Sequence, residues 1–251
     1  MSADDPKDLA GLQRAGTLVA ATIDVLERAV APGVTTGQLD RMAAALFASA
    51  GARSGPIITY GYPGSICISV DDEIVHGVPG SRVLREGQLV TLDVAAELDG
   101  YHADSAITVA VGEASPEARN LIAATERALA TGIAAAQPGA SFRDLGAAIE
   151  RSARASGYSV FRSLTGHGIG RGMHEEPTVY NWPEPSATAR LTDGLVFTIE
   201  PMLGAGGARM RDAGDGWTIC TADGSLAAHA EHTVMVAQGG PRILTRRDAA
   251  L

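Results

Sequence analysis

Five residues in the later part of the chain have side chains that commonly bind metal ions. They are four carboxylic acids and one histidine: Asp93, Asp104, His167, Glu200 and Glu231. An oxygen-rich set with one imidazole suits divalent first-row metals, whereas structural zinc sites prefer thiolates. One divalent cation would leave two of the four negative charges uncompensated in a partly buried site, which is costly. The set therefore favours a two-metal centre, and paired metals that activate water favour hydrolysis of an amide or a phosphoester.

The residues around Asp93 and Asp104 predict a β-hairpin that brings these two acids together. Asp99-Gly100 lies between two alternating, β-branched runs and is a strong signal for a two-residue turn. The turn would pair Ala95 with Asp104 and leave Asp93 diagonal to Asp104 on the same face. Two acids side by side repel each other unless a cation lies between them, and Ala95 and Ala106 leave room for one. The hairpin is interpreted as half of a metal site; the alternative is that each acid is a solvated residue at a sheet edge.

Two later strand-like runs carry the glutamates. They cover residues 195–200 and 231–236, and Glu200 ends the first while Glu231 begins the second. Period-two alternation places the apolar residues of the first run on a face that is expected to pack on helices, and it sends Glu200 to the other face. That is the side toward which the two aspartates are expected to point.

The composition excludes several classes of protein. The chain has 251 residues, 45% hydrophobic and 20% charged, which fits one large or two small globular domains. A net charge of −9 argues against nucleic acid or an anionic membrane as the main partner. The two cysteines, Cys67 and Cys220, lack the spacing of a disulfide framework or a zinc knuckle. No apolar run approaches the length of a membrane span and the start lacks a signal-peptide pattern, so a reduced, cytoplasmic protein is expected.

An internal repeat predicts two related α+β halves of one domain. The run Ala31-Pro32-Gly33-Val34-Thr35 aligns with Gln137-Pro138-Gly139-Ala140-Ser141, an offset of 106 residues. In each copy a long helix comes first, about 6–30 and then about 116–136, and a Pro-Gly break ends it. Thr35 or Ser141 then caps a second helix, and period-two strands follow over about 65–110 and about 158–237. The alternative is a chance match of two Pro-Gly breaks beside Ala-rich helices.

The most specific motif in the chain is Gly166-His167-Gly168-Ile169-Gly170-Arg171-Gly172-Met173-His174-Glu175-Glu176-Pro177. Four glycines at alternate positions let the backbone pass close to a substrate or cofactor. The Lys-Ser/Thr of a phosphate-binding loop is missing, and no apolar helix follows. Further motifs are Asp-Gly-Tyr-His-Ala-Asp-Ser around Asp104, Phe-Thr-Ile-Glu-Pro-Met around Glu200 and Glu-His-Thr at Glu231. Together, and in this order, they closely resemble the methionine aminopeptidases over nearly the whole chain.

This resemblance implies a fold and an activity. The fold would be the α+β pita-bread fold, with two pseudo-symmetric halves (about 6–110 and 111–240), a central curved, mostly antiparallel sheet and helices outside. Residues 1–251 would form a single catalytic domain. The activity would be removal of the N-terminal methionine from nascent proteins and peptides whose second residue is small, by attack of water activated at two divalent metal ions. The ligand set accepts Co, Mn, Fe, Zn or Ni, so the ion used in the cell is left open.

The resemblance also assigns roles to single residues. The metal ligands would be Asp93, Asp104, His167, Glu200 and Glu231, with Asp104 and Glu231 bridging the two ions. Glu200 would also be the general base. His174 would hold the scissile carbonyl and the developing oxyanion, and His76, in the match Val75-His76-Gly77-Val78-Pro79, would contact the substrate near the scissile amide.

A pocket for the methionine side chain is implied as well. It would include Tyr62, Cys67 and Trp217, a soft apolar lining that suits a thioether. For Cys67 and Trp217 the alternative is simple core packing. Met173 stands where the family commonly has Phe, so this wall is expected to be more flexible. Asp71 stands where an Asn often helps to bind a monovalent cation, so that ion is either absent or held more tightly.

The remaining features select a class within the family. His102, His229 and His232 match no ligand position and are interpreted as structural. The second half has no long helical insertion and the start has no Cys-rich extension, which fits a bacterial-style type I enzyme. The expected partners are the N-terminal methionines of nascent chains, with a transient encounter with the ribosome. A membrane partner and a direct nucleic-acid site are not expected, and the protein is expected to be a monomer.

Two alternatives to this function stay open. A prolidase or an aminopeptidase P would share the fold, but Glu231-His232-Thr233 favours the methionine enzymes. A non-catalytic binding protein on the same fold is the second alternative. Such relatives typically lose metal ligands, whereas all five are in place here.

Overall fold

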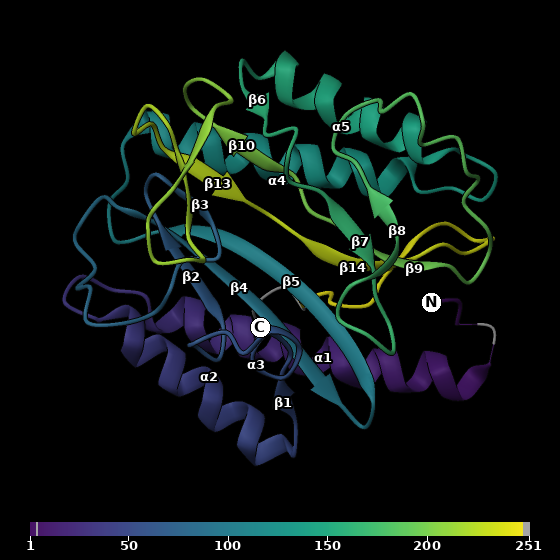
Figure 1. Cartoon of the computed structure of the whole chain (residues 1–251), viewed down its shortest axis with the longest axis horizontal. Coiled ribbons are helices and arrows are strands. Elements are labelled where there is room, and N and C mark those ends of the chain that lie inside the picture. Colours follow the sequence, from purple (N-terminus) through teal and green to yellow (C-terminus); the bar gives the residue numbers. More distant parts are fainter. Residues whose placement is uncertain (4, 248–251) are drawn as a thin grey trace.

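Two groups of helices enclose a layer of antiparallel β-strands (Figure 1). The computed structural model describes residues 1–3 and 5–247. In this part of the chain the helices are α1 (Pro6–Ala29), α2 (Thr36–Ala50), α3 (Gly55–Tyr60), α4 (Pro116–Ala135) and α5 (Phe142–Ala155). In Figure 1, α1 and α2 lie on one side of the strands, and α4 and α5 lie on the opposite side.

The strands are short except for two. The ten-residue strands β4 (Leu89–Leu98) and β5 (Tyr101–Ala110) form the predicted hairpin. The other strands of the first half are β1 (Arg53–Ser54), β2 (Cys67–Val70) and β3 (Glu73–Val75). Those of the second half are β6 (Ser159–Val160), β7 (Gly166–Gly168), β8 (Glu175–Val179), β9 (Val196–Ile199), β10 (Met202–Gly204), β11 (Met210–Asp212), β12 (Ile219–Thr221), β13 (Ala227–His229), β14 (His232–Met235) and β15 (Arg242–Ile243).

The predicted repeat is confirmed at the helices. Thr35 and Ser141 each begin a second helix with a capping box, in which the side chain accepts a hydrogen bond from the third helical residue. Gly51, in the left-handed conformation (φ 69°), caps the end of helix α2. Ser156 caps the end of helix α5, and Gly157 (φ 84°) takes the left-handed conformation one residue later. The first long helix of each copy ends one residue earlier than expected, at Ala29 and Ala135.

The strands form four small antiparallel sheets. Their orders are β1-β4-β2 with β5 beside β4, β13-β10-β6, β11-β12-β3 and β15-β14-β9-β7-β8. The predicted hairpin register is confirmed, because Ala95 pairs with Asp104 and Asp93 with Ala106. The turn residues Asp99 (φ 53°) and Gly100 (φ 80°) both have positive φ, as a two-residue hairpin turn of type I′ requires.

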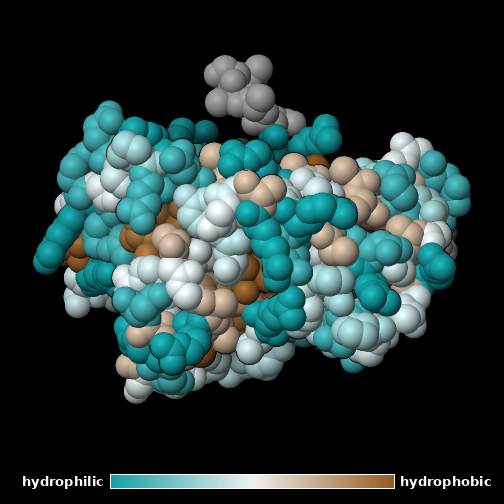
Figure 2. Space-filling view, turned by 90° about the horizontal axis from the view of Figure 1, so that it is seen from above, coloured by the Kyte–Doolittle hydropathy of each residue, from teal (hydrophilic) through white to brown (hydrophobic). Residues whose placement is uncertain are grey.

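The two larger apolar cores each contain one of the helix pairs. One core joins α1 and α2 to β4 and β5, with Leu12, Val19 and Leu92 among its fully buried side chains. The other joins α4 and α5 to β9 and β14, with Phe142 packed edge-on against Phe197 at 5.3 Å. Mainly hydrophilic residues cover the face in Figure 2, and the most hydrophobic residues show only in small recesses.

No apolar run as long as a membrane span is expected from the sequence, and helix α1 differs from this expectation. Its 24 residues are long and apolar enough to cross a membrane by length and composition, with a window of mean hydropathy 1.2. Half of that window is buried within the fold, where Leu12, Ala15 and Val19 pack in the first core. The packing thus accounts for the apolar residues of α1 as those of a core helix.

Hydrogen bonds join the two halves along β5. The backbone of Glu231 donates to the carbonyl of Ala106 at 2.9 Å, and the Ser105 hydroxyl donates to the carbonyl of Glu231 at 2.6 Å. The Thr233 hydroxyl donates to the carbonyl of Asp104 at 2.7 Å and accepts from its backbone N–H at 3.0 Å. These bonds fix the second half against the strand that carries Asp104.

Candidate metal centre

A cavity of about 270 Å³ lies where the two halves meet. Every residue to which the sequence analysis gave a role in catalysis, substrate binding or metal binding lines it: His76, Tyr62, Cys67, Asp93, Asp104, His167, His174, Glu200, Trp217 and Glu231. Pro56, Tyr60 and Met173 complete the lining. The fold therefore gathers into one cavity side chains that are spread over more than half of the chain.

Strand ends and a hairpin position the four acids and the imidazole. Asp93 and Asp104 lie within β4 and β5, and His167 lies within β7. Glu200 follows the last residue of β9 and Glu231 precedes the first residue of β14, so both strands are one residue shorter at this end than expected. Because β9 and β14 pair in antiparallel register through Ile199 and His232, the two glutamates flank the same end of this strand pair.

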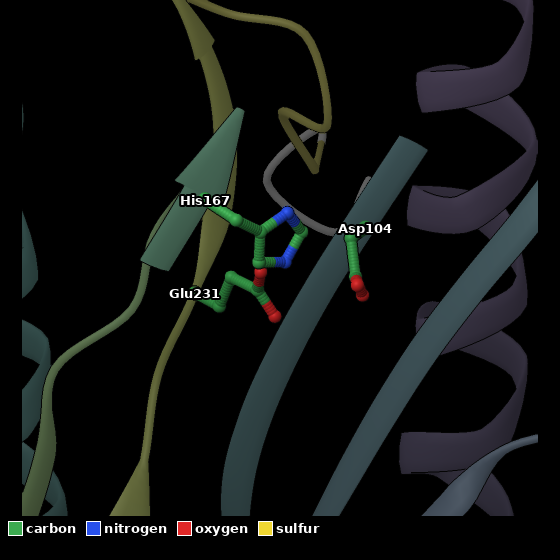
Figure 3. A group of neighbouring side chains, drawn as sticks. All are labelled: Asp104, His167 and Glu231. Atoms are coloured by element: carbon green, nitrogen blue, oxygen red, sulfur yellow. The ribbon is translucent and has the colours of Figure 1, made fainter. Parts of the chain in front are cut away.

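Three of the five residues form a tight cluster. Ligand atoms of Asp104, His167 and Glu231 all lie within 4.8 Å of one another. Figure 3 shows the three side chains close together, Asp104 and His167 from strands and Glu231 from the segment before β14. Glu200 lies beside them, with its Oε1 at 3.5 Å from Nε2 of His167. Asp93 lies outside this cluster but lines the same cavity, diagonal to Asp104 on the paired strand.

The acids lie in an environment that disfavours their charge. Asp104, Glu200 and Glu231 are buried, with exposures of 4%, 8% and 2%, and Asp93 is partly buried. Burial raises the pKa of Asp104 to about 6. Burial, and then the charges of Asp104 and Glu200, raise the pKa of Asp93 and of Glu231 well above the usual range. For Glu200 burial is again the largest cause of a strongly raised pKa.

These carboxylates fit divalent cations. Within the described residues, Oδ1 of Asp104 and Oε1 of Glu231 are buried and have no hydrogen-bond partner in the protein. An unpaired buried oxygen is costly, and a cation at this point would satisfy it and offset the repulsion between the acids. The oxygen-rich donor set with one imidazole matches hard and borderline divalent metals.

The backbone fixes which nitrogen of His167 can bind a metal. Its Nδ1 lies 2.9 Å from the carbonyl oxygen of Gly168, which can only accept a hydrogen bond. The proton of the neutral ring is therefore on Nδ1, and the Nε2 lone pair faces the acids. Burial, followed by the neighbouring His174, lowers the pKa of His167 to about 3, which keeps the ring neutral.

Threonines that the sequence analysis did not assign hold the candidate ligands in place. Thr198 is fully buried; its hydroxyl donates to Oε1 of Glu200 at 2.7 Å and accepts from the backbone of His167 at 3.0 Å. Thr233, also fully buried, makes the two bonds to Asp104 described above. Period two places Thr198 on the face of Glu200, so its role could have been found from the strand pattern.

Aromatic and sulfur-containing side chains form the apolar part of the cavity. Tyr62 packs edge-on against Trp217 at 5.1 Å, and its hydroxyl donates to the carbonyl of Gly77 at 2.6 Å. Cys67 is 5% exposed and Met173 is 8% exposed. Cys67 and Trp217 thus line the cavity rather than being enclosed only by core residues.

The two histidines expected to contact substrate lie on different segments of the cavity wall. His76 has a positive φ of 57°, and its carbonyl accepts a hydrogen bond from the Thr218 hydroxyl at 3.3 Å. His174 lies against His167, with ring centroids 3.9 Å apart. Nδ1 of His174 is 2.6 Å from the hydroxyl of Tyr60, a contact that the sequence analysis did not foresee. Partial removal from water, then the neighbouring His76, lowers the pKa of His174.

The histidines interpreted as structural differ from one another. His232 has its Nδ1 at 2.9 Å from the Thr245 hydroxyl, and the backbone N–H of His102 donates to Gly170 at 2.7 Å. His229 is different, because its Nε2 lies 3.9 Å from a carboxylate oxygen of Glu200 and 3.9 Å from one of Glu231. His229 lines a second, larger cavity of about 500 Å³ between α4 and β15, which contains none of the assigned site residues.

Asp71, the other departure from the family pattern, is paired within the protein. Its carboxylate accepts hydrogen bonds from the Gln88 side chain at 2.6 Å and from the backbone of Leu89 at 3.0 Å. Arg82 lies 3.8 Å away. These donors already satisfy much of the carboxylate, and a monovalent cation at this position stays a prediction.

Comparisons with known proteins agree with this site. The model of metallopeptidase family M24 matches residues 10–238. A methionine aminopeptidase of Clostridium perfringens is 42% identical over 93% of this chain and 94% of its own length. The crystal structure of a methionine aminopeptidase from Rickettsia prowazekii superposes with a TM-score of 0.94 and 37% identity, covering 98% of this chain and all of that one. A prolidase from Pyrococcus furiosus shares the fold alone, with a TM-score of 0.78, 19% identity and 65% of its length covered.

These likenesses confirm the predicted α+β pita-bread fold. The match of the family model covers most of the chain, and the Clostridium and Rickettsia relatives are matched over nearly their full length. The chain belongs to metallopeptidase family M24, and within that family its similarity is to the methionine aminopeptidases.

Proposed function

We propose that this enzyme removes the N-terminal methionine from nascent proteins and peptides whose second residue is small. The observation that carries the proposal is the single cavity of about 270 Å³ that holds four acids and an imidazole beside an apolar pocket. The 42% identity to a methionine aminopeptidase over almost the whole chain supports the choice of substrate.

Two divalent ions fit the donor set. Their ligands would be Asp93, Asp104, His167, Glu200 and Glu231, with Asp104 and Glu231 shared between the ions. Bound divalent ions lower the pKa of water and polarise a carbonyl group. Co, Mn, Fe, Zn and Ni are all compatible with these ligands, and availability in the cell selects among them.

Side chains of the protein accept the proton from water and bind the substrate. Glu200 accepts a proton from the attacking water, and the Thr198 hydroxyl holds one of its oxygens in a fixed direction. His174 donates a hydrogen bond to the oxygen of the scissile carbonyl as negative charge develops there. His76, on the opposite segment of the wall, contacts the substrate near the scissile amide.

The apolar part of the cavity sets the specificity for methionine. Tyr62, Cys67, Met173 and Trp217 give a polarisable lining that suits a flexible thioether. The edge-on pair of Tyr62 and Trp217 forms one part of this lining. Met173 adds a flexible side chain to this wall.

The cellular setting is part of the proposal. Residues 1–251 would act as one catalytic domain, as a monomer in the cytoplasm. The protein substrate would be met during a transient encounter with the ribosome. The acidic net charge of −9 supports a role without a direct nucleic-acid site.

Cleavage of short peptides at defined metal concentrations tests the proposal. The metal-free protein, titrated with Mn(II) or Co(II), should gain activity toward Met-Ala-Ser and reach a plateau near two ions per chain. An Ala-Pro peptide serves as the substrate of the prolidase alternative. Preference for the Ala-Pro peptide would overturn the specificity, and a protein that neither binds metal nor cleaves either peptide would favour a binding role.

A further inference from the structure

His229 is a buried histidine beside the metal centre with no assigned role. It is the last residue of β13 and lies two residues before Glu231. Its backbone is held on both sides by the hydroxyl of Thr108, which accepts from its N–H at 2.9 Å and donates to its carbonyl at 2.8 Å. These hydrogen bonds fix the backbone that carries the imidazole ring.

The imidazole of His229 lacks partners although it is enclosed. The residue is 2% exposed, and neither Nδ1 nor Nε2 has a hydrogen-bond partner among the described residues. Buried polar atoms are usually paired, so an imidazole with both nitrogens unpaired indicates that something is missing from its surroundings. Of the two nitrogens, Nε2 is the one that faces the metal centre.

The nearest acceptors are two of the acids in the cavity. Oε2 of Glu200 and Oε2 of Glu231 each lie 3.9 Å from Nε2 of His229. The other oxygen of Glu200 is already occupied by the Thr198 hydroxyl. A small rotation of either carboxylate brings one oxygen into hydrogen-bond distance of Nε2.

His229 stands behind the carboxylates rather than in the cavity. It does not line the 270 Å³ cavity, and it is absent from the cluster of ligand atoms formed by Asp104, His167 and Glu231. It lines instead the larger cavity on the other side. This placement favours a hydrogen bond to the acids over direct contact with a metal ion.

We propose that His229 is a positioning residue of the metal centre, whose Nε2–H donates a hydrogen bond to Glu200 or Glu231 and orients that carboxylate for metal binding. This inference rests on the proposed roles of Glu200 and Glu231 as ligands. Partners of this kind orient ligands and raise metal affinity without touching the ion.

Metal affinity is the property to measure. Mn(II) binding to the metal-free protein is followed by calorimetry for the wild type, His229→Leu, His229→Gln and His229→Asn. Loss of the donor in His229→Leu should weaken Mn(II) binding about 10- to 100-fold. The Gln variant keeps an N–H donor of similar reach and should stay within about threefold of the wild type, whereas the shorter Asn should bind as weakly as Leu.

Controls separate this role from packing. His102→Gln removes another buried imidazole with an unpaired nitrogen and should leave Mn(II) binding unchanged. Circular dichroism and thermal unfolding of each metal-free variant check the fold. If the Leu variant does not fold, the comparison of Gln with Asn still tests the donor.

Several results would overturn the inference. Wild-type affinity in both His229→Leu and His229→Asn would show that no hydrogen bond is used. Equal weakening in Gln, Asn and Leu would assign His229 to packing. A change in the visible spectrum of the Co(II)-loaded protein that shows one ligand fewer in His229→Gln would make the ring a direct ligand. The proposed function is tested separately, by metal binding and cleavage of Met-Ala-Ser in the wild type.

Discussion

The two halves of the molecule supply the candidate metal centre by different structural means. The first half gives Asp93 and Asp104 from a regular ten-residue hairpin whose register its turn fixes. The second half gives His167, Glu200 and Glu231 from one three-residue strand and from the ends of two four-residue strands. A local turn is enough to place the first pair, whereas the second set depends on hydrogen bonds to β5 and on the buried threonines. The comparison shows that a duplicated helix pair does not require a duplicated site.

Removal of the charge of Glu200 should produce the largest change, because it affects the second set of ligands directly. Glu200→Gln keeps the size of the side chain but removes the base and one ligand charge. We expect the turnover of Met-Ala-Ser to fall about 10³-fold at saturating metal, while the fold is kept. Steady-state kinetics and circular dichroism of the same sample measure both. Wild-type turnover would show that the base is misassigned.

The hydrogen bonds of the Thr233 hydroxyl to Asp104 link the two halves, and a substitution at Thr233 removes them. Thr233→Val removes the hydroxyl that pairs with both backbone groups of Asp104 and leaves those groups unpaired in the interior. The free energy of unfolding should fall by about 2 kcal/mol, as measured by urea denaturation. Thr17→Val, on the exposed face of α1, is the matched control and should change it by less than about 0.5 kcal/mol. Equal effects of the two changes would remove Thr233 from this link.

The contact between Tyr60 and His174, which both line the cavity, allows a test with a smaller expected effect on activity. Tyr60 ends α3 in the first half, and its hydroxyl contacts Nδ1 of His174 in the second. Loss of this contact in Tyr60→Phe leaves His174 less well oriented, so kcat should fall about tenfold with less change in KM. Tyr158→Phe is the control, because Tyr158 does not line the cavity. A change in KM alone would assign Tyr60 to substrate binding.

The hairpin turn should give the smallest effect and the clearest dependence on pH. Burial opposes ionisation of Glu97, but hydrogen bonds from Arg53 and from the backbone of Gly100 outweigh it and lower the pKa of Glu97 below 4.5. A carboxyl with a lowered folded pKa stabilises the protein above its unfolded pKa and loses this contribution as pH falls through the folded value. Glu97→Gln should therefore cost about 1 kcal/mol at pH 7 and progressively less below about pH 4.5. Urea denaturation at pH 7 and pH 3.5 measures the difference; an effect independent of pH would contradict it.

The sequence predicts the first half of the site better than the second. Asp99-Gly100 determines the hairpin, and the capping residues Thr35 and Ser141 determine where two helices begin. The contact of His229 with Glu200, and that of Tyr60 with His174, join residues 29 and 114 positions apart, so no local pattern reveals them. The motifs around Glu200 and Glu231 marked those residues through resemblance, because strand periodicity gives only the face and not the convergence. The strands of the expected, mostly antiparallel layer divide into four hydrogen-bonded sheets, a subdivision that the sequence does not predict.

The candidate ligands come from segments far apart in the sequence, so they are synthesised at different times. The last of them, Glu231, is translated well after the hairpin has emerged and after both helix pairs are complete. Until then the growing polypeptide holds at most a partial set of donors and has no finished catalytic apparatus. The candidate site can therefore be completed only after the segment that carries Glu231 has been made.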